Sequence, residues 1–374
     1  MARKPLRYGF TTGSAAAAGA KAGILCLAGR GPVRKIDIPL PMGGRLTIPI
    51  AEAVVDGTGC VVTVVKDGGD DPDVTHRIRI KSIVGLLPEG DPSQITILGG
   101  EGVGMVTRRG LSLPVGESAI NPVPRQQIRD AVSEGLKETG LSGPVSVTIE
   151  AVNGERIAQK TLNPRLGIVG GISILGTRGT VKPFSNKAYT DTITVSMDVA
   201  KVAGVSTIAL TTGGRSERFL KEKIPTLPDV AFVQVADFFS FSVKQAAAKG
   251  FADILYACFF GKLVKMAQGH PYTHARKCEI DFDLFAHGCW SLGMKPERTE
   301  NVARANTARE ALGIILDDPH GERIMDDLVN RALVSARGFT GPLPDITYYL
   351  FDFGGGLLAS KSLKGSGALN HSAF

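Results

Sequence analysis

Four aspartates and a histidine lie within one short segment, KDGGDDPDVTH, at residues 66–76. These side chains are Asp67, Asp70, Asp71, Asp73 and His76. Carboxylates this close together repel one another unless cations or backbone N–H groups neutralise them. Such groups can accept a proton or stabilise positive charge in a reaction, which makes all five candidate catalytic residues. A solvated turn is the plainer alternative, and the ligand spacing of an EF-hand is missing.

Three further segments of the first half are suited to binding anions. Residues 99–110 read GGEGVGMVTRRG, in which successive glycines let N–H groups converge on an anion and an arginine can clamp a carboxylate. Residues 11–14 and 121–125 each begin a predicted helix, whose N-terminus attracts anions. Ordinary helix caps are the alternative, but together the three predict a substrate with several carboxylates. The candidate substrate-binding residues are Thr11, Thr12, Gly13, Ser14, Glu101, Gly102, Gly104, Thr107, Arg108, Asn121 and Arg125.

Glycine-rich segments also follow predicted strands in the second half, at residues 170–179, 211–214 and 261–262. Open α/β sheets bind ligands at the carboxyl ends of their strands, so these segments indicate a ligand site. Neither GxGxxG nor GxxxxGK[ST] occurs, which disfavours a standard NAD or P-loop nucleotide site, and the GxSxG of hydrolases is also missing. His270 and His274 have i,i+4 spacing, but Pro271 interrupts a shared helical face, and no metal site is predicted.

The sequence resembles the cobalt-precorrin-5B C1-methyltransferases of the anaerobic route to cobalamin. The segments that carry the resemblance follow the family's order: YGFTTGSAAAAGAKA (8–22), VVKDGGDDPDVTH (64–76), GGEGVGMVTRRGL (99–111), PVGESAINPVPR (114–125), LGIVGGISILGTRG (166–179), GKLVKMAQG (261–269) and Thr273-His274. The resemblance implies methyl transfer from S-adenosylmethionine to ring carbon C1 of a cobalt-containing precorrin, giving cobalt-precorrin-6A. Cobalt would then be part of the anionic tetrapyrrole substrate.

With this resemblance, we expect S-adenosylmethionine at the glycine-rich strand ends of the second half. The candidate cofactor-binding residues are Gly170, Gly171, Gly176, Thr177, Thr211, Thr212, Gly213, Gly261, Lys262, Lys265, Thr273 and His274. The chain departs from the family pattern at Arg77, where a glycine is common, and at Phe259-Phe260, where Gly-His is common. It also has Ser14-Ala15 in place of the family's Thr-Cys, which disfavours a cysteine-based mechanism.

The elements expected to position these residues form two domains. Residues 1–163 read as an α+β domain with helices near 15–28 and 125–138, strands near 36–40, 46–55, 60–65, 78–84 and 95–98, and a hairpin turning at 153–154. Residues 164–374 read as a Rossmann-like α/β domain with extra C-terminal helices, its first strand at 167–169. A Gly/Ser-rich tail from about residue 355 is predicted to be disordered.

Composition limits the function further. The 374 residues include 43 Lys and Arg against 36 Asp and Glu, a formal charge of +7, which favours an anionic partner. The basic residues are dispersed and aromatics are only 6%, which counts against a nucleic-acid-binding module. Five cysteines without CxxC spacing, no signal peptide and no long apolar run predict a cytoplasmic protein without a membrane segment. The alternative function is a corrinoid-binding or reductase step without methyl transfer. The sequence also allows a homo-oligomer.

Overall fold

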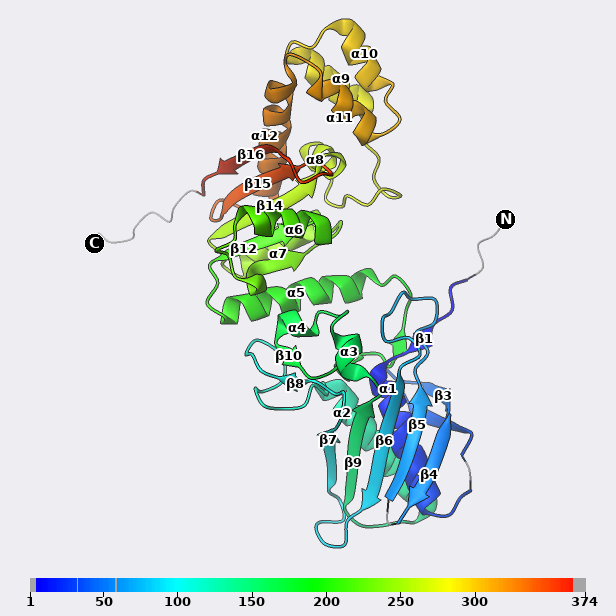
Figure 1. Ribbon diagram of the computed structural model, residues 1–374. Coiled ribbons are helices and arrows are strands. Elements are labelled where there is room, and N and C mark those ends of the chain that lie inside the picture. The colour runs from blue at the N-terminus through cyan, green and yellow to red at the C-terminus, as the bar shows by residue number, and fades with distance from the viewer. Residues whose placement is uncertain (1–4, 32, 58, 366–374) are drawn as a thin grey trace, which may run out of the picture. The chain divides into compact units, whose positions relative to one another are not determined.

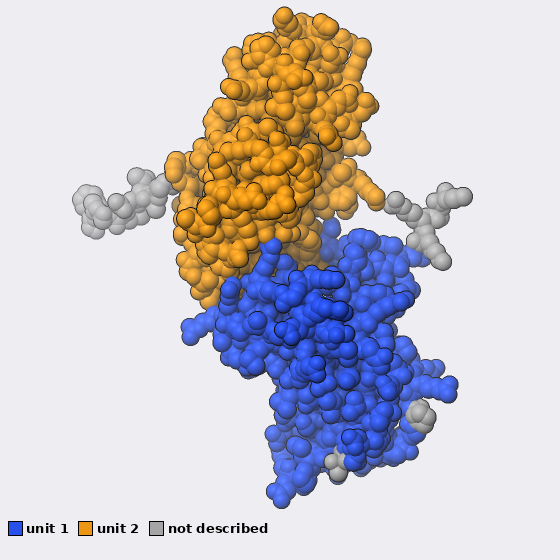
Figure 2. Space-filling view, in the orientation of Figure 1, with its two compact units in different colours: residues 1–186 blue, residues 187–374 orange. Residues whose placement is uncertain are grey.

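The computed structural model describes residues 5–31, 33–57 and 59–365, with mixed α/β structure in two compact units. Unit 1 comprises residues 1–186 and unit 2 residues 187–374 (Figure 2).

Unit 1 is built on a five-stranded sheet in the order β4-β5-β6-β9-β7, antiparallel except that β7 runs parallel to β9 (Figure 1). Its elements are β1 (Gly9–Phe10), α1 (Thr12–Leu27), β2 (Lys35–Pro39), β3 (Arg45–Pro49), β4 (Glu52–Asp56), β5 (Gly59–Val65), β6 (Arg79–Leu86), β7 (Ile95–Gly99), β8 (Met105–Val106), α2 (Pro122–Thr139), β9 (Val145–Ala151), α3 (Gly154–Ala158), α4 (Asn163–Leu166), β10 (Ile168–Val169) and β11 (Thr180–Val181).

Helix α1 packs on one face of this sheet because its small residues allow a close approach. On β6, alternate residues Ile80, Ser82 and Val84 are buried, as expected for a strand with one covered face. A Cβ at Gly23 would lie 2.5 Å from Val84 Cγ2, and a Cβ at Gly19 would lie 2.5 Å from Ser82 Oγ. The glycines therefore set how close the helix lies to the sheet.

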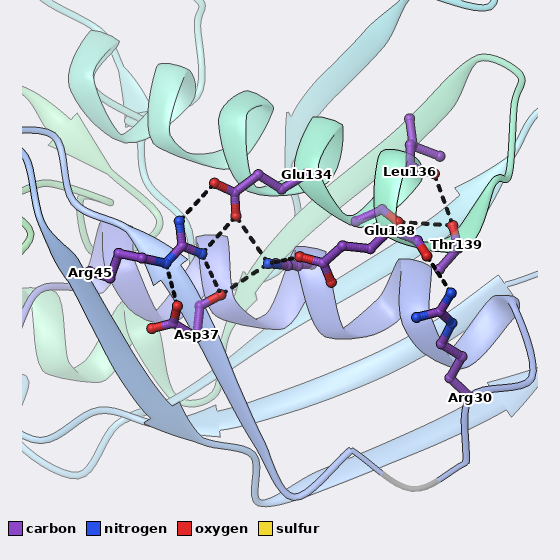
Figure 3. A network of polar contacts seen from close by, with 9 residues as sticks. Arg30, Asp37, Arg45, Glu134, Leu136, Glu138 and Thr139 are labelled. Carbon is purple, nitrogen blue, oxygen red and sulfur yellow. Dashed lines mark hydrogen bonds and ion pairs between the residues drawn. The ribbon is translucent and has the colours of Figure 1, made fainter.

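A polar network ties α1 to α2 and to the β2–β3 ribbon (Figure 3). Lys21 of α1 is buried and forms ion pairs with Glu134 at 3.0 Å and with Glu138 at 2.6 Å. Glu134 also pairs with Arg45 at 2.9 Å, and Arg45 bonds Asp37. Hydrogen bonds from Arg45 are the main reason that the pKa of Glu134 falls to about 2, with a further contribution from Lys21.

The boundary between the units differs from the expected one after residue 163. Strand β11 pairs with β1, and β10 pairs with β8, so residues 164–186 are bound into unit 1. The segment expected to be the first Rossmann strand is therefore a short antiparallel partner of β8. The expected hairpin at 153–154 is wrong: Asn153 adopts φ 59°, and the short helix α3 begins directly after it.

Unit 2 contains a second five-stranded sheet, in the order β13-β12-β14-β15-β16, parallel except for the edge strand β16. Its elements are α5 (Asn186–Val202), β12 (Thr207–Thr211), α6 (Gly214–Lys223), η1 (Asp229–Ala231), β13 (Phe232–Gln234), α7 (Phe239–Ala248), β14 (Asp253–Phe259), α8 (Phe260–Ala267), α9 (Phe282–Ser291), α10 (Pro296–Ala303), α11 (Ala308–Leu316), α12 (Gly321–Thr340), β15 (Asp345–Phe351) and β16 (Leu357–Leu363).

Apolar side chains cover both faces of this sheet. Ile208, Ile254 and Ile346 belong to a large core with residues of α5, α7, α8 and α12, while Ala209 and Ala257 pack with Phe219 and Leu220 of α6 on the other face. Strand β16 corrects the prediction of a disordered tail from about residue 355, since residues 357–363 pair along β15; residues 366–374 lie outside the described part. Among the described residues, no helix is both long enough and apolar enough to span a membrane.

Candidate functional site

The acidic segment, residues 66–76, is the loop between β5 and β6, and we call it the acidic loop. The N-terminal segment crosses it in close contact. A Cβ at Gly9 would lie 2.3 Å from the carbonyl oxygen of Asp67, and a Cβ at Gly69 would lie 2.3 Å from that of Arg7. Because side chains larger than glycine cannot fit at this crossing, the two glycines fix the path of the loop.

Asp73 is held by the buried Lys66, whose ammonium forms an ion pair with it. Its other oxygen, Oδ1, accepts hydrogen bonds from the N–H and the hydroxyl of Thr75, at 2.7 and 2.6 Å. Burial alone would raise the pKa of Asp73, but Lys66 and Thr75 outweigh it and the pKa lies below its ordinary value. A carboxylate stabilised as an anion in this way is a weak proton acceptor, so the position of Asp73 favours a role in holding the loop.

The other three aspartates also have partners in unit 1. Asp67 pairs with the guanidinium of Arg7, and this hydrogen bond is the main cause that lowers the pKa of Asp67. Asp70 Oδ2 accepts from the backbone N–H of Arg7 at 2.7 Å, and Asp71 Oδ1 accepts from that of Phe184 at 2.8 Å. Cations and N–H groups thus neutralise the closely spaced carboxylates of the loop, which would otherwise repel one another.

His76 is exposed, and one of its ring nitrogens is bonded within the loop. Its Nδ1 accepts a hydrogen bond from the N–H of Gly68 at 3.0 Å, so the neutral ring carries its proton on Nε2. This geometry favours His76 as a hydrogen-bond donor to an anionic group. The next residue, Arg77, has φ 63°, a backbone conformation that glycine adopts more easily.

Two exposed aromatic side chains flank the acidic loop, and the sequence analysis missed both. Phe184, whose N–H bonds Asp71, is 66% exposed and has φ 54°; Tyr8, beside the crossing at Gly9, is 55% exposed. The neighbour of Tyr8, Gly9, pairs with Val181, which precedes Lys182. Their signal in the sequence was weak, since each is a single aromatic residue in a short loop.

The helix start at residues 11–14 is buried and hydrogen-bonded within unit 1. Thr12 Oγ1 accepts from the N–H of Leu175 at 2.9 Å, and the Ser14 hydroxyl donates to the carbonyl of Gly179 at 2.8 Å. Thr11 caps α1 by accepting from Ser14 N–H at 3.2 Å. Residues 173–179 therefore cover the N-terminus of α1, which favours a supporting role for these residues.

The glycine-rich segments at 99–104 and 170–176 pack against each other. A Cβ at Gly171 would lie 2.1 Å from the carbonyl oxygen of Gly102, and a Cβ at Gly104 would lie 2.8 Å from that of Gly171. These glycines permit close backbone packing, and they belong to unit 1. The same unit also holds four of the candidate cofactor-binding residues: Gly170, Gly171, Gly176 and Thr177.

The remaining substrate-side candidates divide into internal and exposed ones. Arg125 donates to the carbonyls of Ile120 and Ile97 at 2.9 and 3.1 Å. The Thr107 hydroxyl donates to the carbonyl of Gly167 at 2.8 Å. By contrast, Glu101 and Arg108 are exposed, and Asn121 is partly exposed.

A second candidate site lies in unit 2, at the carboxyl ends of the parallel strands. The chain leaves β12 through α6 to reach β13 on one side, and then passes through α7 to β14 on the other side. This divergence is a topological switch point, where open α/β sheets bind ligands. Thr211 ends β12, Thr212 and Gly213 follow it, and Gly261 and Lys262 lie in the first turn of α8 after β14.

The structure adds Asp237, just after β13, to this second site. Asp237 Oδ1 lies 3.1 Å from Lys262 Nζ and accepts from the Thr273 hydroxyl at 3.3 Å. Lys262 also donates to the carbonyl of Ala236 at 2.8 Å, and Lys265 Nζ donates to the carbonyl of Thr273 at 3.3 Å. Two predicted residues, Lys262 and Thr273, thus contact a carboxylate that the sequence analysis missed, and the predicted Lys265 bonds Thr273.

Aromatic rings stand beside Asp237. Phe238 stacks on Tyr189 with centroids 5.3 Å apart and meets the edge of Tyr272 at 5.1 Å. Tyr272 in turn stacks on His274 at 6.0 Å. Burial and the nearby charge of Asp237 raise the pKa of both tyrosines. Within the described part of the chain, no group of three or more His, Cys, Asp and Glu is placed to hold a metal ion.

Comparison with known proteins matches both parts of the chain. The CbiD family model matches residues 1–183, and the model of the CbiD C-terminal domain matches residues 272–362. A cobalt-precorrin-5B C(1)-methyltransferase of Nitratidesulfovibrio vulgaris is 46% identical over 364 residues, covering 96% of this chain and 93% of that protein. One of Thermus thermophilus is 41% identical over 351 residues, covering 94% and 93%. A crystal structure of a cobalamin biosynthesis protein (cbiD) from Archaeoglobus fulgidus is 28% identical and covers 68% of this chain and 78% of that chain, with a TM-score of 0.40.

Proposed function

Because this chain belongs to the CbiD family of cobalt-precorrin-5B C(1)-methyltransferases, we propose that it methylates carbon C1 of cobalt-precorrin-5B. The observation that carries the proposal is the 46% identity to the Nitratidesulfovibrio vulgaris protein of that name over 96% of this chain. We propose S-adenosylmethionine as the methyl donor and cobalt-precorrin-6A as the product, within cobalamin biosynthesis. The chain is then a C-methyltransferase, and cobalt is part of its substrate.

For S-adenosylmethionine, we propose the switch point of unit 2, which we interpret as Rossmann-like. The parallel strands β13, β12, β14 and β15 and the helices on both faces support this interpretation. When bound, S-adenosylmethionine supplies an electrophilic methyl group. Thr212, Gly213, Lys262 and Thr273 are the candidate residues of the sequence analysis that we place around it.

For the tetrapyrrole, we propose the acidic loop of unit 1 and its surroundings. Three exposed cations nearby, Arg77, Arg178 and Lys182, have no carboxylate partner among the described residues, and they match a substrate whose arms are carboxylates. Exposed Tyr8 and Phe184 offer apolar surface for the macrocycle.

The chemistry requires little beyond positioning. Methyl transfer from a sulfonium to carbon is an in-line displacement, for which a fixed geometry and exclusion of water lower the barrier. His76 Nε2–H is suited to holding a carboxylate arm of the substrate. Within the described residues, no donor reaches Asp70 Oδ1 or Asp71 Oδ2, so these two aspartates, rather than Asp67 and Asp73, are our candidates to accept a proton.

The test is incubation of the protein with methyl-labelled S-adenosylmethionine and cobalt-precorrin-5B. We expect the label on ring carbon C1. Binding of the tetrapyrrole without transfer of label would instead favour a corrinoid-binding or reductase step. If the protein neither binds the tetrapyrrole nor transfers the label, the proposed function is refuted.

A further inference from the structure

We infer that Asp237 binds the ribose hydroxyls of the adenosyl group, with the rings of Phe238 and Tyr272 beside the adenine. The inference rests on the proposed use of S-adenosylmethionine by unit 2, and it names the residues that recognise the nucleoside. None of these three residues was a candidate on sequence grounds.

The position of Asp237 in the fold carries the first step. In dinucleotide-binding sheets, a glycine turn follows one strand, and an acidic residue about 20 residues later, after the neighbouring strand, accepts from a ribose hydroxyl. Here the Gly213-Gly214 turn follows β12, and Asp237 follows β13, the neighbour of β12 in the sheet. Both stand at the carboxyl edge beside the switch point.

The contacts of Asp237 leave one oxygen for a ligand. Lys262 and Thr273 both approach Oδ1. In the part of the chain that the structure describes, no donor reaches Oδ2, although the side chain is only 20% exposed. A carboxylate oxygen in this setting is a strong hydrogen-bond acceptor, and a diol supplies the matching donors.

The charges at Asp237 favour the ribose over the sulfonium as the group that this carboxylate binds. Lys262 lies 3.1 Å from Asp237 and neutralises its charge, which weakens any attraction of the pair for a second cation. A hydrogen bond to a neutral hydroxyl depends less on net charge. The carbonyl that anchors Lys262 belongs to Ala236, which has φ 47°, and strained backbone of this kind is common at ligand sites.

The neighbouring rings suit a purine. Phe238 and Tyr272 are both partly exposed, and their centroids are 5.1 Å apart. Aromatic faces next to a hydroxyl-binding carboxylate match the two halves of a nucleoside, a flat base and a diol.

The first experiment measures the affinity of the full chain for S-adenosylmethionine and for S-adenosylhomocysteine, which lacks the sulfonium charge. For Asp237→Asn we expect both affinities to fall by a similar factor, about tenfold, because both ligands carry the ribose. The matched control is Asp253→Asn, at the opposite end of the same sheet, where the carboxylate accepts from Thr207; we expect no change. A loss confined to S-adenosylmethionine, or no loss, would overturn the inference.

The second experiment tests whether Asp237 contacts the ribose directly or whether its substitution weakens binding by disturbing the fold. An S-adenosylhomocysteine analogue without ribose hydroxyls should bind the unaltered protein about tenfold more weakly, and Asp237→Asn should cause no additional loss. Additive losses would overturn the assignment of the carboxylate to the ribose. Failure of the unaltered protein to bind either natural ligand would refute the use of S-adenosylmethionine instead, so the two failures are distinguishable.

Discussion

Phe184 joins an exposed aromatic ring to a strained backbone, with φ 54° held by the hydrogen bond from its N–H to Asp71. Phe184→Gly removes the ring and suits the conformation, so we expect the free energy of unfolding to change by less than about 1 kcal/mol. The KM for the tetrapyrrole should rise several-fold. Met42 is an exposed apolar residue in the β2–β3 turn, so Met42→Ala should leave the free energy of unfolding and the KM unchanged. An unaltered KM for Phe184→Gly would exclude Phe184 from the substrate surface.

The aspartates of the acidic loop should differ from one another in what they support. Asp73→Asn leaves the buried Lys66 without its carboxylate, and we expect a loss of about 2 kcal/mol in the free energy of unfolding, measured with urea. Asp71→Asn keeps an oxygen to accept from Phe184 N–H, so stability should hold while turnover falls. Equal stability of the two variants would contradict this division.

At the scale of elements, the distance between α1 and its sheet depends on glycine. Gly23→Ala forces a methyl group to 2.5 Å from Val84 Cγ2, and we expect a loss of about 1–3 kcal/mol in the free energy of unfolding of unit 1. Gly313→Ala in α11 meets no atom within 4 Å and should instead stabilise unit 2 by about 0.5–1 kcal/mol. Thermal unfolding of both variants tests the contrast, and a stabilised Gly23→Ala would refute close packing here.

The network between α1 and α2 should make unit 1 sensitive to acid. The pKa of Glu134 is about 2 in the folded protein, below its ordinary value of 4.5. Its contribution to stability is therefore complete above about pH 4.5 and is lost as the pH falls toward 2. Glu134→Gln should reduce the free energy of unfolding at pH 7 by about 1 kcal/mol, because Glu134 and Arg45 are partly exposed, and should flatten its dependence on pH in this range. An unchanged pH profile would contradict the role of the network.

Local patterns predicted many elements but few long-range partners. The alternation before residue 66 places the acidic loop after a strand, as the structure does at β5, and the cap residues before Ala15 predict α1. Nothing local shows that the chain near Gly9 crosses the loop, because that contact joins segments far apart in sequence. Asp237 was missed because a single Asp after the short strand β13 has no spacing that distinguishes it from a surface residue.

At the scale of the whole molecule, the apolar cores follow the two units. Among the described residues, the cores of unit 2 draw on residues beyond 187, and those of unit 1 on residues before 187. A unit with its own core can fold alone, so we expect residues 1–186 and 187–374 each to unfold cooperatively when produced separately. This expectation allows the cofactor assignment to be tested on the units.

Residues 187–374 alone should bind S-adenosylhomocysteine within a few-fold of the affinity of the full chain, because Asp237, Lys262 and the switch point all lie in unit 2. Residues 1–186 should not bind it, although this unit contains the glycine-rich segment 170–179 that the sequence analysis assigned to the cofactor. Calorimetric titration of both pieces decides between the two locations. Binding by residues 1–186 alone would show that the glycines of this segment, and not the strand ends of unit 2, recognise the methyl donor.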